Sequence, residues 1–287
     1  MIVRPVLPSE RPELGALLSQ DPLINLFLLS MLERDGLPGE GPKGMFYGLW
    51  ERDRLGGTSA RSDLVAVVYV SPGGLVVPWA PWSEHALSLG RYLASRHVIQ
   101  LLIGPRGATD ALWEGYGRSG HVRTRFDQRL YVCRQPTPGP LAEGLRLARE
   151  DDAGVVGRFA SRMMLEDLGY DPGQISPRAH AQAVVRRIQE GRTWVVERHG
   201  ELVFKIDLGS TCSEGATVGG TYVVPALRNQ GLCGRAMRGV ATALLHSHSV
   251  VALHLNEANA PAIGCYAAVG FVRDAPMRLM VIEPGRP

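Results

Sequence analysis

Lysine is scarce in this sequence of 287 residues, in which only Lys43 and Lys205 occur and arginine supplies nearly all the positive charge. Thirty-one basic residues stand against 28 acidic ones, so the formal net charge is only +3. Because electrostatic binding of nucleic acid needs a concentrated positive charge, this balance gives no support to a nucleic-acid partner. One group of arginines, typical of a solvated face and less often of a site for an anionic partner, comprises Arg118, Arg123, Arg125, Arg129 and Arg134.

Cysteine is also sparse, and its four occurrences form no Cys-x-x-Cys pair and no metal-ligand spacing: Cys133, Cys212, Cys233 and Cys265. This pattern argues against a disulfide framework or a metal site and favours a reducing compartment. No apolar run reaches about 18 residues, and no charged-then-apolar leader opens the chain. We therefore expect a cytoplasmic protein that neither spans a membrane nor binds a metal.

A proline-rich stretch near the middle divides the chain. RQPTPGPLAEG, at 134–144, follows a strand-like segment and precedes an amphipathic one. Because proline continues neither a helix interior nor a central strand, we predict a linker at 136–142. At about 100–200 residues per domain the chain holds two domains, which we place at 1–135 and 143–287.

The two halves share a pattern that indicates a duplicated domain. YGRSGHVRTRFDQRLYV, at 116–132, resembles YAAVGFVRDAPMRLMV, at 266–281. Upstream, GGLVVP at 73–78 resembles GGTYVVP at 219–225, in the same order along the chain. Two ordered matches at nearly equal spacing predict two copies of one fold.

Helical and strand periodicities alternate in the second half, which predicts a mixed α/β domain with a strand, a glycine turn and a helix at its centre. The expected elements are a strand at 144–148, helices at 151–169 and 176–192, a hairpin over 193–209, a strand at 216–224, a helix at 230–248, a strand at 249–256, a short helix at 260–270 and a closing strand at 278–283.

The glycine turn, LRNQGLCGRA at 227–236, has the features of an anion site. Gly231 and Gly234 let the backbone approach a ligand closely. The start of the following helix presents free N–H groups and the positive end of the helix dipole. Arg228 and Arg235 add cationic donors suited to phosphate. By itself the pattern fits either a phosphate cradle or an ordinary corner with a helix cap.

The residues around the turn complete a more specific pattern. VVPALRNQGLCGRAM, followed by LHLNEANAPAIGCYAAVGF, resembles the Gcn5-related N-acetyltransferase (GNAT) family, with Asn256, Asn259, Tyr266 and Gly270-Phe271 in the family's order. The resemblance covers roughly 144–287, and the whole chain looks like GNAT proteins in which a GNAT-like half precedes the active one. It implies tandem GNAT-like domains with a mixed α/β fold, each with a mostly antiparallel central sheet flanked by helices.

The resemblance implies an N-acetyltransferase that uses acetyl-CoA and transfers the acetyl group to a primary amine of a small-molecule, peptide or protein acceptor. The turn would cradle the pyrophosphate of coenzyme A, and the preceding strand would hydrogen-bond its pantetheine arm. The residues assigned in this way to the cofactor are Thr221, Tyr222, Val223, Val224, Arg228, Asn229, Gln230, Gly231, Leu232, Cys233, Gly234 and Asn259.

Cys233 departs from the family pattern, which has glycine or alanine at this position. Cysteine is small and packs as a modest hydrophobe, so the cradle tolerates it. A helix N-terminus also lowers the pKa of a thiol, which leaves a reactive Cys233 as an alternative.

Tyr266 matches the tyrosine that protonates the departing thiolate in the family, so the resemblance implies that it is the general acid. Tyr116 occupies the matching position in the first half, where a tyrosine can serve packing alone. No general base stands out, because the strand at 216–224 carries no glutamate or histidine. Glu166 or His254 is the candidate base; further candidates, besides a water relay, are Asp207 and Glu257.

The first half lacks these features. Its counterpart of the turn, VVPWAPWSEHALSLG at 76–90, has Trp79, Pro81 and Trp82 but no glycine or arginine at the corner. We expect this half to pack against the active half and shape the acceptor site rather than hold the cofactor. Two other functions stay open: a non-catalytic acyl-CoA sensor, and a transferase for another acyl donor such as a longer acyl-CoA or aminoacyl-tRNA. We expect a monomer or a homodimer.

Overall fold

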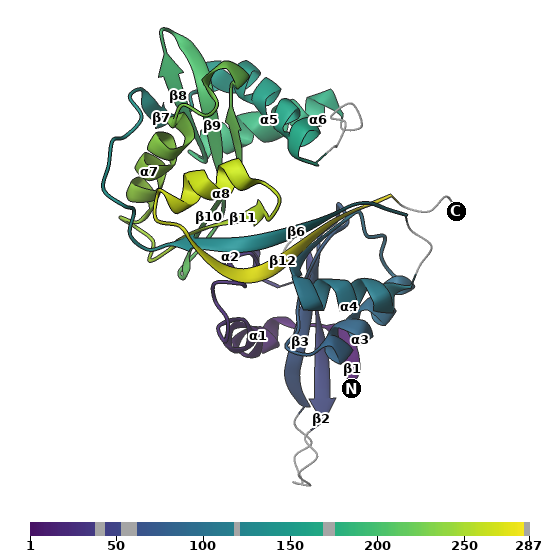
Figure 1. The fold of residues 1–287 in the computed structure, drawn as a ribbon. Helices are drawn as coiled ribbons and strands as arrows, with labels where there is room; N and C mark the ends of the chain where they lie inside the picture. Colours follow the sequence, from purple (N-terminus) through teal and green to yellow (C-terminus); the bar gives the residue numbers. More distant parts are fainter. Residues whose placement is uncertain (38–43, 53–61, 118–120, 169–175, 284–287) are drawn as a thin grey trace. The chain divides into compact units, whose positions relative to one another are not determined.

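The structure is a computed structural model that describes residues 1–37, 44–52, 62–117, 121–168 and 176–283 (Figure 1). Contacts divide the chain into two compact units. Unit 1 contains Met1–Leu130, Asn256–Ala258 and the C-terminal segment from Asp274, and unit 2 contains Tyr131–Leu255 and Asn259–Arg273. Within the described ranges, no helix has both the length and the apolar character needed to cross a bilayer.

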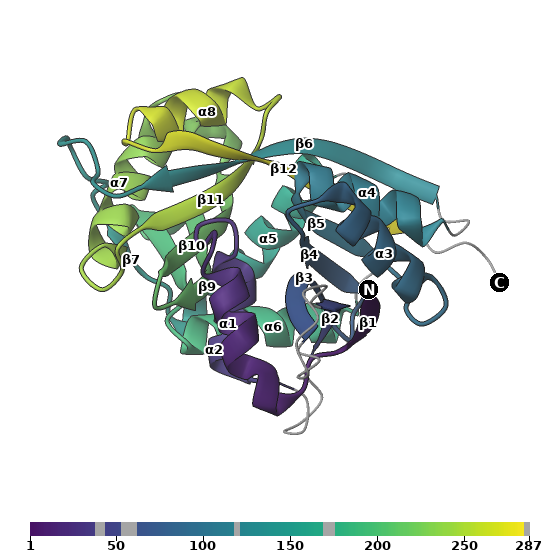
Figure 2. The same cartoon turned by 90° about the horizontal axis from the view of Figure 1, so that it is seen from below.

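Unit 1 is built on strands in the order β1-β2-β3-β4-β5-β12. These strands are β1 (Ile2–Pro5), β2 (Met45–Arg52), β3 (Ser62–Val70), β4 (Leu75–Trp79), β5 (Leu101–Pro105) and β12 (Val272–Glu283). Its helices are α1 (Arg11–Leu18), α2 (Leu26–Asp35), α3 (Ser83–Ala94) and α4 (Arg106–Tyr116). The helices α3 and α4 lie side by side, as Figures 1 and 2 show, and they bury a core against the sheet that includes Val68, Leu89 and Leu112.

Unit 2 has strands in the order β11-β10-β9-β8-β7, and the end of β6 (His121–Cys133) lies next to β11. The other strands are β7 (Leu145–Leu147), β8 (Thr193–Arg198), β9 (Glu201–Cys212), β10 (Gly215–Val223) and β11 (Val251–Asn256). Its helices are α5 (Ala153–Leu168), α6 (Pro177–Gln189), α7 (Leu232–Leu244) and α8 (Ala260–Ala267). Every element expected in this half is present, and the hairpin turns at His199 and Gly200, both with positive φ.

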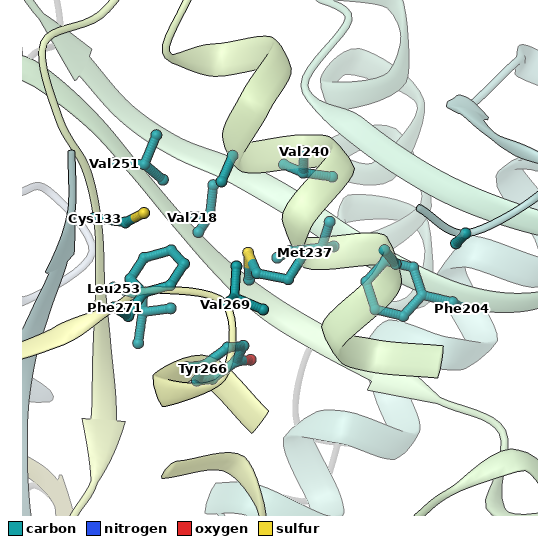
Figure 3. Packing of buried hydrophobic residues seen from close by; sticks show 14 of the residues in the cluster. Cys133, Phe204, Val218, Met237, Val240, Val251, Leu253, Tyr266, Val269 and Phe271 are labelled. Atoms are coloured by element: carbon teal, nitrogen blue, oxygen red, sulfur yellow. The ribbon is translucent and has the colours of Figure 1, made fainter. Parts of the chain in front are cut away.

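The core of unit 2 explains why α7 forms where it does. Met237 and Val240, three residues apart on one helical face, pack against Val218 of β10 and against Val251 and Leu253 of β11 (Figure 3). A fully buried aliphatic side chain contributes about 1.5–3 kcal/mol, so this face attaches α7 firmly to the two strands.

The predicted duplication is confirmed at the level of the fold. The order β4-α3-β5-α4-β6 in the first half recurs as β10-α7-β11-α8-β12 in the second. In each copy the first two strands run parallel and pair at two positions, Leu75–Val76 with Leu101–Leu102 and Ala216–Thr217 with Val251–Ala252. Most other pairs of the twelve described strands are antiparallel, so the predicted mixed α/β class is confirmed as well.

The compact units do not coincide with the predicted division into 1–135, 136–142 and 143–287. The strand β6 crosses a unit boundary after Leu130, and β12 crosses one after Arg273. From Met277 to Val281, β12 pairs with β5 in unit 1, although it is the closing strand of the second copy. The predicted division follows the two repeats along the sequence, and it stays a prediction.

Candidate active site

A gap opens where β10 and β11 separate. Their parallel pairing ends at Thr217 and Ala252, whereas β10 continues to Val223 and β11 to Asn256. A cavity of about 750 Å³ lies at this gap within unit 2, and both strands, α5, α7 and α8 line it. The separation leaves backbone groups of β10 facing the cavity instead of a neighbouring strand.

A β-bulge shapes β10 on its other edge. Gly219 pairs with Asp207 and Tyr222 with Lys205, so β10 carries one extra residue. Gly220 has a φ of +61°, and a Cβ there would lie 2.9 Å from Asp207 Oδ2 and 3.1 Å from Lys205 Nζ. The bulge therefore requires glycine at this position, since the buried ion pair fills the space beside it.

Asp207 is held by three donors. Lys205 Nζ donates to Asp207 Oδ2 at 2.6 Å, Arg187 Nη1 to the same oxygen at 3.1 Å, and Thr193 Oγ1 to Oδ1 at 2.9 Å. Burial lowers the pKa of Lys205, and the adjacent carboxylate opposes that shift. Asp207 lies outside the cavity lining and supports the bulge, so this candidate base is poorly placed for proton transfer.

Tyr266 projects from α8 into the same cavity. Asn259 caps α8 by accepting a hydrogen bond from the N–H of Ala262 at 3.2 Å. The Tyr266 ring packs in the core beside Phe271 and Val269 (Figure 3). Its hydroxyl donates to Thr221 Oγ1 at 3.1 Å. Burial raises the pKa of Tyr266 well above 10, so this hydroxyl keeps its proton at neutral pH.

The glycine turn forms the start of α7. Gly231 is the residue before the helix and has a φ of +71°. It has no side chain that could accept a hydrogen bond from the first N–H groups of the helix. The first N–H groups of a helix have no intrahelical acceptor, so those of Leu232, Cys233 and Gly234 are free to bind a ligand. All three residues line the cavity. The turn is thus a corner whose free donors lie at a cavity wall, the geometry that binds an anion.

The cavity brings together most of the predicted site residues: Thr221, Tyr222, Val223, Arg228, Asn229, Gly231, Leu232, Cys233, Gly234, Asn259, Tyr266, Glu166 and His254. Two predicted cofactor residues lie outside the lining. The N–H of Val224 donates to Val203 O at 3.1 Å, and Gln230 Nε2 donates to Ala226 O at 2.9 Å. Their roles stay predictions.

Arg228 and Glu166 form an ion pair at the edge of the cavity. Arg228 Nη2 lies 2.7 Å from Glu166 Oε2, its Nε donates to Val223 O at 3.0 Å, and its guanidinium lies over the ring of Tyr222. Both charged side chains are about 40% exposed, and an ion pair as exposed as this contributes little stability. Arg228 can therefore exchange this carboxylate for a phosphate at small cost.

His254 lies on β11 between Leu253 and Leu255, which point into the core shared with α7 and α8. Because side chains alternate along a strand, His254 faces the other side of β11 from these two leucines, and all three residues line the cavity. Burial lowers the pKa of His254 to about 4, so the ring is neutral at pH 7. It can accept a proton there, although as a weak base.

Glu257 is unsuited to the role of base. It belongs to unit 1, where Arg106 Nη2 and Arg129 Nε bind its two oxygens at 2.6 and 2.7 Å. The hydrogen bonds from these arginines lower the pKa of Glu257 to about 2. Of the four candidates, Glu166 and His254 are the two in the cavity.

The depressed pKa of His254 predicts an acid-sensitive fold. The neutral ring is favoured in the folded state, so the stability it contributes is full above pH 6.5 and is lost as the pH falls towards 4. We expect His254→Gln to reduce the loss of unfolding free energy between pH 7.5 and pH 5 by about 1–2 kcal/mol. Urea unfolding at both pH values measures this loss of unfolding free energy in the variant and in the parent. The exposed His246, replaced in the same way, is the matched control, and equal pH dependence of His254→Gln and the parent would contradict the assignment.

Sequence reasoning did not single out several residues of this region, among them Met163 and Arg238, which line the cavity. Cys265, which precedes Tyr266, lines the cavity. Lys205 is buried beneath the bulge with 1% of its surface exposed. The sequence could have drawn attention to Lys205, because it is one of only two lysines and lies within an apolar strand. Nothing in the sequence distinguished Cys265 except its position next to Tyr266.

The equivalent place in unit 1 is closed. A Cβ at Gly104 of β5 would lie 3.1 Å from both Pro78 Cδ and Pro78 O, so β4 and β5 stay in contact where β10 and β11 separate. Pro78 also lacks the N–H that a bound arm would need. Tyr116, the counterpart of Tyr266, donates its hydroxyl to His97 O at 2.9 Å and so serves the packing of this unit.

Most members of the aromatic and basic groups of the first half are buried or ion-paired. Trp79 is buried and Trp82 is 65% exposed, so the two do not form one aromatic surface. Three arginines of the basic group are ion-paired within unit 1: Arg123 with Glu283, Arg125 with Asp110, and Arg129 with Glu257. The remaining members are Arg134, which is exposed, and Arg118, which lies outside the described residues.

Comparisons with known proteins concern the family and the fold. Residues 162–271 match the model of the Acetyltransferase (GNAT) family. A comparison of the sequence with curated proteins finds no match.

Solved structures with a similar fold span the whole chain. They include a GCN5-related N-acetyltransferase from Sphaerobacter thermophilus (TM-score 0.59, 15% identity, 100% of this chain and 96% of that one). A GNAT-family acetyltransferase from Colwellia psychrerythraea is also similar (TM-score 0.56, 11% identity, 99% and 100%). So is a tandem GNAT protein from the clavulanic acid biosynthesis pathway (TM-score 0.54, 14% identity, 100% and 99%). At these identities the likeness concerns the fold alone.

Proposed function

Because this chain carries a domain of the GNAT acetyltransferase family at 162–271 and has the fold of tandem GNAT proteins, we propose that it is an acetyl-CoA-dependent N-acetyltransferase. Its second copy would be the active domain, and the acceptor would be a primary amine of a small molecule, a peptide or a protein. One observation carries the proposal: a single cavity contains the free N–H groups of the glycine turn, the gap beside β10 and the Tyr266 hydroxyl.

The residues of the cavity fit coenzyme A. The turn leaves no side chain at Gly231, its donors are free, and the guanidinium groups of Arg235 and Arg238 add positive charge at the same wall. The volume of about 750 Å³ lies within the range of cofactor pockets. When bound, acetyl-CoA supplies an activated acetyl thioester that an amine can attack directly.

Tyr266 is placed to move a proton. Its hydroxyl is neutral, buried and oriented by Thr221 Oγ1, so it can protonate a sulfur anion as that anion leaves. A backbone N–H of β10 at the gap would stabilise negative charge on the acyl oxygen, because that N–H is fixed and shielded from water.

The acceptor would enter on the side of α5. There the cavity is lined by Met163 and Glu166 of α5, by Tyr222 and by His254. Among the described residues, the buried hydroxyl of Tyr222 has no hydrogen-bond partner, so it is available to a polar group of the acceptor. His254 or Glu166 would take the proton from the ammonium group, directly or through water.

A thermal-shift and calorimetric titration with acetyl-CoA tests the cofactor, and a thiol-release screen over amines, amino acids and peptides tests the reaction. We expect stabilisation of about 2.7 kcal/mol at 100 times the Kd, followed by thiol release with at least one amine. Binding without turnover on any amine would favour a sensor. Tighter binding of a longer acyl-CoA would indicate another donor, and no stabilisation by any acyl-CoA would overturn the proposal.

A further inference from the structure

The backbone of Val223, the last residue of β10, faces the gap between β10 and β11. The N–H of the next residue, Val224, donates to Val203 O of β9 at 3.1 Å. In an antiparallel pair, residues that bond to the neighbouring strand alternate with residues whose backbone points away from it. Val223 lies opposite Phe204 in this register, so its N–H and C=O point away from β9. Because β11 is the other neighbour of β10, these groups lie on the side of the gap, which we call the open edge of β10.

The side chain of Arg228 lies against this open edge. Its Nε donates to Val223 O at 3.0 Å, and its Nη2 donates to Glu166 Oε2 at 2.7 Å. The guanidinium carbon lies 5.4 Å from the ring centroid of Tyr222, and that ring packs against Phe159 of α5. Arg228 is therefore held between the end of β10 and α5 by contacts with both elements.

This arrangement excludes a ligand chain from the end of the open edge. An arm that hydrogen-bonds to β10 has to lie beside it as a neighbouring strand does, at about 4.8 Å. A guanidinium nitrogen 3.0 Å from Val223 O occupies that place. Arg228 and such an arm therefore compete for the same backbone position. The cost of moving Arg228 is small, because both members of its ion pair with Glu166 are about 40% exposed.

Glu166 loses its partner when Arg228 moves. It lines the cavity beside Met163 of α5, on the side where the acceptor would enter. While Arg228 binds it, the charge of this carboxylate is compensated. Once Arg228 has turned to a phosphate, the carboxylate is available to an ammonium group, with which it forms a charge-assisted hydrogen bond.

We propose that Arg228 closes the open edge of β10, and that acyl-CoA, by displacing it, releases Glu166 to bind the ammonium group of the acceptor. This rests on the proposed function, since it takes acyl-CoA and an amine as the ligands. Both ligands require the open ion pair, so each raises the affinity for the other by the same factor. For an ion pair as exposed as this one, we expect a factor of about three.

Calorimetry with acetyl-CoA tests the displacement without an activity assay. Glu166→Gln removes the carboxylate that holds Arg228, so we expect acetyl-CoA to bind about threefold more tightly than to the parent. Arg228→Gln removes the competing guanidinium, so adding Glu166→Gln to it should change nothing further. Equal affinity of Glu166→Gln and the parent would overturn the proposal. A threefold gain that persists in Arg228→Gln would also overturn it, since Glu166 would then act only by repelling the phosphates.

Glu190→Gln is the matched control for this measurement. Glu190 is an exposed carboxylate that lies 4.0 Å from Arg192 Nε, and it is outside the cavity lining. Its replacement should leave the affinity for acetyl-CoA unchanged. A gain equal to that of Glu166→Gln would show that the effect follows from net charge and would contradict the displacement.

The release of Glu166 is tested with n-butylamine as a simple primary ammonium probe and with coenzyme A, which has no acetyl group to transfer. Saturation-transfer NMR titrations measure the affinity for the amine with and without saturating coenzyme A. We expect about threefold tighter binding in the presence of coenzyme A and no such difference in Glu166→Gln. The uncharged 1-butanol should show no difference in either protein.

No coupling between coenzyme A and butylamine in the parent, or equal coupling in Glu166→Gln, would overturn the release of Glu166. Failure of the parent to bind acetyl-CoA would contradict the proposed function itself. Binding of acetyl-CoA by the parent with no response to Glu166→Gln would contradict only the displacement of Arg228.

Discussion

Gly231→Glu is expected to weaken acetyl-CoA binding at least 100-fold. The new carboxylate would stand at the start of α7, where the free N–H groups of the turn otherwise receive the pyrophosphate, and would repel its negative charge. A Cβ at this position would also lie 3.1 Å from Arg235 Nη1, and the φ of +71° disfavours any side chain. Isothermal titration calorimetry with acetyl-CoA measures the effect.

Gly191→Glu is the matched control for this variant. Gly191 has a φ of +66° and open space beside it, and it lies outside the cavity lining. Both variants should lose about 1 kcal/mol of unfolding free energy through backbone strain, but only Gly231→Glu should lose the cofactor. Affinities within threefold of each other in the two variants would show that the turn does not hold the pyrophosphate.

Tyr266→Phe is expected to lower kcat about 100-fold while the Kd for acetyl-CoA changes less than threefold. The hydroxyl that supplies the proton is lost, whereas the ring that packs beside Phe271 remains. Steady-state kinetics with an amine identified by thiol release, together with calorimetry, separate the two quantities.

Two further variants test what the hydroxyl does. Tyr116→Phe removes the same atom at the matching position of unit 1, and with it the hydrogen bond to His97 O. It should cost about 1 kcal/mol of stability and leave kcat unchanged. Thr221→Val removes the acceptor that orients Tyr266 and should lower kcat by about tenfold, since the donor is still present but less well directed. A kcat of Tyr266→Phe close to that of Tyr116→Phe would exclude Tyr266 as the general acid.

The two copies of the fold differ at three places that a cofactor would need. In unit 2 the strands β10 and β11 separate, a glycine with positive φ starts α7, and the tyrosine of α8 reaches a hydroxyl in the cavity. In unit 1 Pro78 contacts Gly104, the helix α3 follows Trp82, and the tyrosine of α4 binds a backbone carbonyl. Proline at the gap lacks the N–H that a bound arm would need, and the corner has no glycine to allow close backbone approach.

The sequence carried the architecture well because the signals for it are local. Period-3.6 patterns placed α5, α6 and α7, alternating apolar segments placed β8 to β11, and the glycine at 231 marked the start of α7. The duplication was visible because the two copies keep the same order of elements. The sequence did not show that β12 of the second copy pairs with β5 of the first, since this pairing depends on contacts between residues far apart in the chain.

In the candidate site too, some residues were predicted from the sequence and others could be judged only from the structure. The turn, Asn259 and Tyr266 were assigned through the resemblance to the GNAT family, and all three line the cavity. The candidate bases could not be ranked from sequence, because their protonation depends on neighbours from other elements. Glu257 meets two arginines that precede it by more than a hundred residues, and His254 owes its low pKa to burial.

By itself, the sequence determined that this chain is a duplicated mixed α/β protein with one intact glycine turn, since periodicity and glycine spacing are properties of neighbouring residues. Only the tertiary structure decided that β10 and β11 separate and that Tyr266 meets Thr221. Each of these features joins residues from different elements. Their distances are set by how α7 and α8 pack on the sheet, and no local pattern encodes that packing.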